Sequence, residues 1–224
     1  MDDRERRRSL GLKRGLWLAL VGALAAIAYA GRIGGGKPPE DALFQYETAI
    51  SGIVLYLILL GVAVALGSGL PLREFFALRR PASWPRALGL ALGGYVGIFL
   101  GAGLLLQLLD AGDEQGLTPD GWDSSKAGAY AANFVAIALV GPVVEELLYR
   151  GAGMSLFGAL GAVPAVAITS LAFGLAHGLV LALAALVLFG VVTALLRLRT
   201  NSVYPCMLVH CAFNATSLVV AVAA

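Results

Sequence analysis

Seven apolar runs dominate this chain and restrict it to a fold that lipid can solvate. They cover residues 15–30, 49–66, 87–109, 127–148, 156–176, 178–196 and 203–222. Most are near the ~20 residues that a membrane-spanning helix needs. Hydrophobic residues make up 59% of the sequence and charged residues 13%, whereas soluble domains have about 45–50% and about 25%. The sequence therefore predicts an all-α polytopic membrane protein, a bundle of about seven transmembrane helices forming a single membrane domain over residues 1–224.

The distribution of lysine and arginine predicts how this bundle is oriented. With seven spans, thirteen of the sixteen basic residues fall on one side, including six in the basic tail of residues 1–14 and four in the loop 67–86. The opposite side has only Arg32, Lys37 and Lys126, together with the acidic residues Asp110, Asp113, Glu114, Asp120 and Asp123. Because basic loops stay in the cytoplasm, we expect a cytoplasmic N-terminus and an outer C-terminus. The expected location is a cell membrane, namely the bacterial inner membrane.

Two segments allow two interpretations each. Residues 15–30 follow a basic tail and end in Ala28-Tyr29-Ala30, which resembles a signal-peptide cleavage site; a retained first helix is favoured over a cleaved signal. The loop 67–86 mixes arginines with large apolar residues. It is either an amphipathic segment along the cytoplasmic surface or an ordinary basic loop with aromatic anchors.

Several classes of site have no support in the sequence. Cys206 and Cys211 are five residues apart in one apolar run, on different faces of a helix, and are poorly oriented for a disulfide. There is no CxxC, HExxH or paired-cysteine pattern, so no conventional zinc site and no cofactor are expected. The arginines form no stripe interleaved with aromatic residues, which argues against nucleic-acid binding.

The adjacent carboxylates Glu145 and Glu146 lie in the fourth apolar run, where charged groups must find a partner and commonly serve function. Glu146 precedes Arg150 by four residues, the favourable order for an ion pair on a helix. Glu145 lies about 100° further round and shares its face with Gly141 and Tyr149. This geometry leaves Glu145 available as a general base. The alternative is a helix end that an ion pair caps near the membrane interface.

The only two histidines also lie in apolar runs, each with a partner four residues away. Phe173 and His177 share one helix face, and His210 and Asn214 share another. Either pair alone is equally consistent with a core histidine or a hydrogen bond between helices. Together with Glu145 on a third segment, they can activate water, donate to a developing oxyanion and protonate a leaving amine.

Three ordered motifs therefore carry the chemistry of the chain. They are Glu145-Glu146-x-x-x-Arg150, Phe173-x-x-x-His177 and His210-x-x-x-Asn214. Over about residues 127–218 this set resembles the motifs of the CPBP family, which contains the type II CAAX prenyl endopeptidases and the bacterial Abi-type membrane proteins. No diagnostic motif lies in the first three apolar runs.

The resemblance implies an intramembrane glutamic endopeptidase. The implied site residues are Glu145, Glu146, Arg150, His177, His210 and Asn214, with Phe173 and Tyr149 in support. In this assignment Glu145, assisted by His177, activates the attacking water, and His210 with Asn214 forms the oxyanion hole. The carboxylate and guanidinium of the ion pair position the site. The implied substrate is a membrane-associated peptide or protein, cut near its C-terminus and in some relatives lipidated.

Other interpretations remain open at this stage. Glu145, His177 and His210 are the second-choice ligands of a metal such as zinc, although Asn214 and Arg150 then need other roles. A non-catalytic binding or immunity protein of the same fold, and an ion-coupled carrier, are further possibilities. A sorting peptidase that removes the C-terminal anchors of surface proteins is a specialised form of the enzyme.

The depth of His177 tests whether the site closes. If the fifth run spans the membrane from Leu156, it carries His177 to the outer half, away from Glu145, His210 and Asn214. We therefore infer that the fourth helix continues past Arg150, or that the fifth helix is tilted or short.

Overall fold

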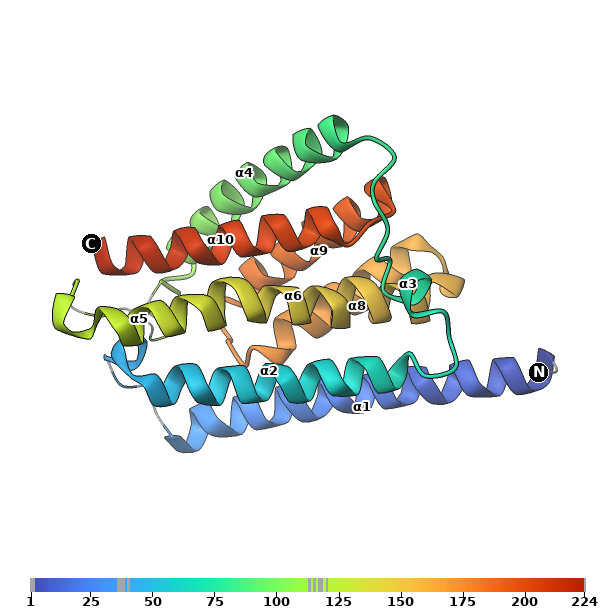
Figure 1. Ribbon diagram of the computed structural model, residues 1–224, viewed down its shortest axis with the longest axis horizontal. Helices are drawn as coiled ribbons and strands as arrows, with labels where there is room; N and C mark the ends of the chain where they lie inside the picture. Colours follow the sequence, from blue (N-terminus) through green and yellow to red (C-terminus); the bar gives the residue numbers. More distant parts are fainter. Residues whose placement is uncertain are drawn as a thin grey trace.

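The chain folds into an all-helical bundle in a computed structural model (Figure 1). The structure describes residues 3–35, 39, 41–112, 114, 116, 119 and 121–223. Lys37, Asp113 and Asp120 of the predicted outer loops lie outside these residues. No strand occurs within the described part of the chain.

Seven apolar helical segments build the bundle. They are α1 (Asp3–Gly35), α2 (Tyr46–Leu66), α4 (Trp84–Leu108), a composite fourth helix over Ser124–Leu160, α8 (Ala162–Ala176), α9 (Leu183–Thr200) and α10 (Tyr204–Ala223). Six of them are long and apolar enough to cross a membrane, and α8 is shorter. Outside the composite helix, the remaining short elements are η1 (Ala42–Phe44) and α3 (Leu72–Phe75). The predicted fold class is confirmed.

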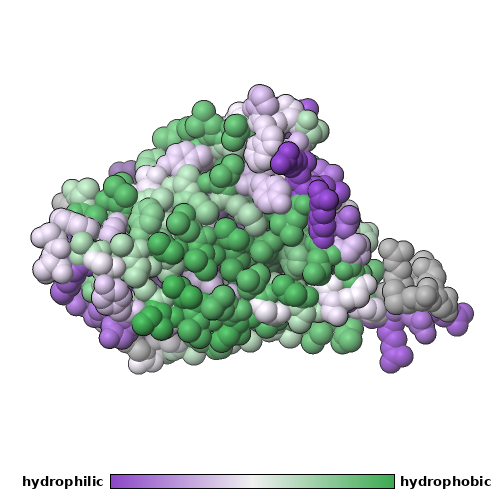
Figure 2. All heavy atoms as spheres, in the orientation of Figure 1, coloured by the Kyte–Doolittle hydropathy of each residue, from purple (hydrophilic) through white to green (hydrophobic). Residues whose placement is uncertain are grey.

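The two ends of the chain lie at opposite ends of the bundle (Figure 1). A broad hydrophobic belt separates hydrophilic surfaces at these two ends (Figure 2). The chain is thus a multi-pass membrane protein, as its composition predicted. The basic loop 67–86 and the start of α1 share one end, which the positive-inside prediction assigns to the cytoplasm.

The fourth helix is longer than predicted. Its parts are η2 (Ser124–Lys126), α5 (Ala127–Phe134), η3 (Val135–Val140), α6 (Gly141–Glu146), η4 (Leu147–Gly153), α7 (Met154–Phe157) and η5 (Gly158–Leu160). The expected end at residue 148 was wrong because Arg150 is buried inside the bundle and does not mark the membrane surface. Gly161, with φ of 104°, ends the helix instead. Both η3 and η4 are wide π-helical turns, which are frequent near functional sites.

The turn at Gly161 places His177 at the depth of Glu145. Glu145 lies 16 residues before Gly161, and His177 lies 16 residues after it on the antiparallel helix α8. At 1.5 Å per residue, both are about 24 Å from the turn. The sequence-based inference about depth is therefore confirmed in both forms, because the fourth helix is long and the fifth is short.

Glycine ends α8 directly after His177. Gly178 has φ of 66°, a left-handed conformation that glycine adopts without strain. A Cβ at Gly178 would also lie 2.7 Å from Cβ of Ala28 on α1, closer than real Cβ contacts allow. The glycine thus lets the chain turn beside α1 and leaves His177 as the C-cap residue of α8.

The first helix is an integral part of the packing. It begins at Asp3, so most of the predicted basic tail is helical. The Trp17 side chain is fully buried, and its Nε1–H donates to the carbonyl of Leu148 at 3.0 Å. Lys13 Nζ donates to the carbonyl of Leu66 at the end of α2. Residues 15–30 are thus helical and pack into the bundle.

The loop 67–86 is anchored to the protein rather than laid along the surface. Before α4 begins at Trp84, only Leu72–Phe75 is helical, and both Phe75 and Phe76 are buried. Ser155 Oγ donates to the carbonyl of Phe75 at 2.6 Å. The two adjacent phenylalanines of this loop therefore pack within the protein.

At the opposite end, Glu114 ties the acidic loop to the start of α9. Its carboxylate accepts hydrogen bonds from the backbone N–H groups of Val180 and Ala182, both at 2.7 Å. Arg32 Nη1 donates to the Glu114 carbonyl at 2.7 Å. Desolvation raises the pKa of Glu114, but these N–H donors, that of Leu181 and the Arg32 charge together outweigh it, so the net pKa lies below its ordinary value.

This loop contact predicts an acid-sensitive contribution to stability. Because the folded-state pKa of Glu114 is lowered, its stabilisation is fully present above the unfolded value near 4.5 and is lost as pH falls through the folded pKa. We expect Glu114→Gln to lower the melting temperature in detergent at pH 7, and the gap to wild type to close on acidification below about pH 4.5. Thermal unfolding curves from pH 7 to 3 measure it; a gap that stays constant contradicts the assignment.

Candidate active site

Helix α6 carries both glutamates and gives them different environments. The Glu146 side chain is fully buried, whereas 16% of the Glu145 side chain remains exposed. This short helix has Pro142 in its first turn, and the wide turns η3 and η4 flank it on either side. The predicted separation of the two carboxylates onto different faces is present.

The predicted ion pair of Glu146 and Arg150 forms in the interior. Arg150 Nη1 lies 3.1 Å from Glu146 Oε1, and both side chains are completely buried. The guanidinium carbon lies 4.5 Å from the centroid of the Phe173 ring, a cation–π contact, and Nη2 donates to the carbonyl of Gly190 on α9. Among the described residues, neither Glu146 Oε2 nor Arg150 Nε has a hydrogen-bond partner. The pair is thus held by charge, stacking and one backbone contact.

His210 lies between the two carboxylates. Its Nδ1–H donates to Glu146 Oε1 at 2.9 Å, and its Nε2 lies 3.8 Å from Glu145 Oε2. The ring is buried and packs edge-on against Phe189, with 4.6 Å between ring centroids. The contact with Glu146 joins residues 64 positions apart, so sequence spacing held no signal for it.

His177 has a defined tautomer because its partner can only accept. Its Nδ1 lies 2.7 Å from the carbonyl oxygen of Phe173, so Nδ1 carries the hydrogen. In the neutral ring Nε2 is then an acceptor. The Phe173 ring lies 4.6 Å from the imidazole, as their predicted common face requires.

Asn214 is fixed by the wide turn η3. Its Nδ2 donates to the carbonyl of Ile137 at 2.9 Å. A side-chain amide nitrogen has two hydrogens, so one N–H of Asn214 remains for another acceptor.

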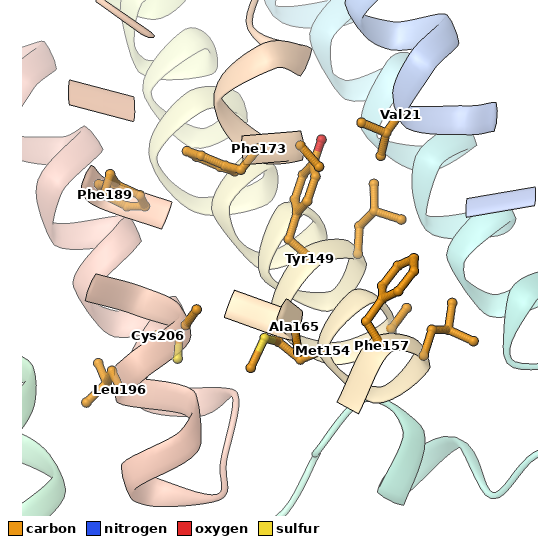
Figure 3. Packing of buried hydrophobic residues seen from close by; sticks show 14 of the residues in the cluster. Val21, Tyr149, Met154, Phe157, Ala165, Phe173, Phe189, Leu196 and Cys206 are labelled. Carbon is orange, nitrogen blue, oxygen red and sulfur yellow. The ribbon is translucent and has the colours of Figure 1, made fainter. Parts of the chain in front are cut away.

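A cavity of about 600 Å³ brings most of the predicted residues together. Its walls include Glu145, Tyr149, Phe173, His177, His210 and Asn214. Glu146 and Arg150 are not on the wall and lie buried behind it. Tyr149 and Phe173 are close together, with their ring centroids 5.3 Å apart, and Phe189 approaches from α9 (Figure 3).

The cavity extends toward the end of the bundle that carries the C-terminus. Its wall includes residues from the end of α4, the loop after it, the segment between α8 and α9, and the second half of α10, namely Leu106, Ala111, Gly112, Leu179, Ala182, Ser217 and Ala221. Several belong to the acidic loop and to the segment that Glu114 contacts. Glu145 and the two histidines therefore lie in a cavity whose other wall residues are largely apolar.

Tyr56 on α2 is a wall residue that sequence reasoning missed. Its hydroxyl faces the Glu145 carboxylate and is within reach of it as a hydrogen-bond donor. A hydroxyl within the apolar run 49–66 was the only signal, and no spacing connects it to Glu145.

Metal ligation was the second-choice role of Glu145, His177 and His210. Within the described part of the chain, no group of three or more histidine, cysteine, aspartate or glutamate side chains has a geometry that could hold a metal ion. Both cysteines are free thiols.

Breaking the buried ion pair is expected to destabilise the protein strongly. Arg150→Met leaves Glu146 as a buried charge opposed only by His210, which should lower the free energy of unfolding by about 3–5 kcal/mol. Adding Glu146→Gln removes that charge and should restore part of the loss. Denaturant titration in detergent micelles measures all three proteins; a double variant no more stable than Arg150→Met alone would contradict this electrostatic cause.

A family model described as type II CAAX prenyl endopeptidase Rce1-like matches residues 127–216. The match covers the composite fourth helix from Ala127 onward, α8, α9 and most of α10. No curated protein and no solved structure matches the chain significantly. The resemblance predicted from the three motifs is confirmed: residues 127–216 are similar to the Rce1-like type II CAAX prenyl endopeptidases of the CPBP family.

Proposed function

We propose that the chain is an intramembrane endopeptidase that hydrolyses a peptide bond of a membrane-associated substrate with glutamate-activated water. The observation that carries the proposal is the convergence of Glu145, His177, His210 and Asn214 on one cavity from three different helical segments. The family match supports a protease, and a peptide within the membrane is the substrate that such a protease requires.

Glu145 is proposed to take a proton from the attacking water. Its carboxylate is partly exposed in the cavity, whereas that of Glu146 is occupied by Arg150 and His210. His177 presents Nε2 as an acceptor, because Nδ1 is committed to Phe173. Two acceptors can hold both hydrogens of one water and leave a lone pair on its oxygen for attack on the carbonyl carbon.

His210 and Asn214 are proposed to stabilise the oxyanion that this attack creates. Asn214 has one amide N–H beyond its bond to Ile137. His210 donates from Nε2 only as an imidazolium, since Nδ1–H is already used by Glu146. Donors fixed before the reaction are the most effective form of such stabilisation.

The Glu146–Arg150 pair is proposed to orient His210. Glu146 Oε1 holds Nδ1, so Nε2 must face away from it and toward Glu145 and the cavity. In the second half of the reaction the proton removed from water passes from Glu145 or His177 to the leaving amine. The C–N bond then breaks, and the products are a carboxylate and an amine.

Loss of the base is expected to abolish processing without unfolding the protein. Glu145→Gln keeps the shape of the side chain and should lower the turnover rate by about 10²- to 10⁴-fold, as should His177→Gln. The measurement is mass spectrometry of membrane and surface proteins from cells that carry each variant, searching for C-terminal processing that disappears. Glu74→Gln, the same chemical change at an exposed residue of α3, is the matched control.

Unchanged processing in Glu145→Gln would favour the non-catalytic alternative of the same fold, a binding or immunity protein. Such a protein sequesters a peptide and needs no base. Comparable melting temperatures of variant and wild type are required for this comparison.

A second candidate is the sorting peptidase that cuts C-terminal anchors of surface proteins. The specific observation is that the cavity extends toward the C-terminal, acidic end of the bundle, which the positive-inside prediction places outside. In this case the products that depend on Glu145 should be exported proteins with a trimmed C-terminal anchor. Cytoplasmic proteins with lipidated C-termini are the products expected of CAAX-type cleavage, so the identity of the processed proteins decides between the two.

A further inference from the structure

We propose that Tyr56 is a positioning residue that holds the Glu145 carboxylate in the cavity and away from His210. Its consequence for catalysis rests on the proposed function, whereas its effect on the resting site does not. Tyr56 belongs to α2, outside the segment that the family model matches.

The two side chains lie next to each other. The Tyr56 hydroxyl packs against Gly141, one turn before Glu145, within reach of the Glu145 carboxylate as a hydrogen-bond donor, and both side chains line the cavity. Among the described side chains, Tyr56 and His210 are the polar partners of this carboxylate. A carboxylate accepts up to about four hydrogen bonds, so one phenol leaves room for a water molecule.

Gly141 makes the space for this contact. A Cβ at Gly141 would lie 2.6 Å from both Cζ and Oη of Tyr56, far inside van der Waals contact. Gly141 is one helical turn before Glu145, so the phenol rests on the backbone of α6 directly beside the carboxylate. Glycine is unfavourable inside a helix, and the packing of Tyr56 supplies the physical reason for it here.

The position of His210 explains why it matters that Tyr56 holds Glu145. Glu145 Oε2 and His210 Nε2 are 3.8 Å apart, beyond hydrogen-bonding distance but close enough to meet after a small side-chain movement. Such a movement would join the proposed base to the proposed oxyanion donor and occupy both. Tyr56, by holding Glu145 from the α2 side, keeps these two groups separate.

The test uses two variants that remove the contact differently. Tyr56→Phe deletes the hydroxyl, and Gly141→Ala leaves the hydroxyl but displaces the ring. The matched control is Tyr95→Phe, which deletes a tyrosine hydroxyl of α4 that pairs with Thr216 Oγ1 at 2.9 Å and lies off the cavity wall. Because alanine is the better helix former, Gly141→Ala also provides a test if Tyr56→Phe fails to fold.

The first readout needs no substrate. The chain has only two histidines, so protein with ¹⁵N-labelled histidine gives signals from two imidazoles, and His177→Gln assigns them. In detergent micelles, we expect Tyr56→Phe and Gly141→Ala to shift the His210 Nε2 resonance, because Glu145 moves toward it. Tyr95→Phe should leave that resonance in place. An unshifted His210 resonance in both cavity variants would overturn the proposal.

The second readout is turnover of a processed substrate. Tyr56→Phe should lower kcat about 10- to 100-fold, the loss expected for a misplaced reacting group, while KM changes less than about twofold. Tyr95→Phe should stay within about twofold of wild type in both parameters. A loss confined to KM would overturn the positioning role. A shifted His210 resonance in a protein without any peptidase activity would instead support the Tyr56 contact and contradict the proposed function.

Discussion

The buried charge on Glu146 is the constraint on which the rest of the site depends. A carboxylate withdrawn from solvent is costly unless it is compensated, and the protein compensates it twice, with Arg150 from the next turn and with His210 from α10. Arg150 in turn contacts the Gly190 carbonyl of α9 and the Phe173 ring of α8. One charge therefore fixes the rotation of four helical segments, and the surfaces that face the cavity follow from it.

Depth is set by a second feature, the turn at Gly161. It gives the fourth helix and α8 a common starting level, so residues equally distant from the turn lie side by side. A fifth helix that began at Leu156, as the sequence predicted, would have carried His177 beyond Glu145, and the later turn at Gly161 prevents that. The site thus requires α8 to be short, while the six longer helices are long and apolar enough to cross a membrane.

Local patterns could be predicted from the sequence, and tertiary ones could not. The ion pair of Glu146 and Arg150 followed from spacing along one helix, as did the common face of Phe173 and His177. The helix end at residue 148 was misjudged because a charge was taken as a sign of the interface, whereas aromatic rings and Glu146 make Arg150 a buried residue. The contact of His210 with Glu146 depends on how α10 packs against α6, which no periodicity encodes. Tyr56 was missed for the same reason.

The helices outside the matched segment therefore do more than enclose the motifs. Trp17 of α1 donates to the Leu148 carbonyl within the π-helical turn η4, where backbone hydrogen bonding departs from the α-helical pattern. Tyr56 of α2 reaches Glu145, the more exposed of the two glutamates. Motif residues supply the charges and the imidazoles, and side chains from helices without a motif add to the contacts that position them. It follows that transplanting the motifs alone into another bundle would reproduce the ion pair, which is local, and lose the separation of Glu145 from His210, which is not.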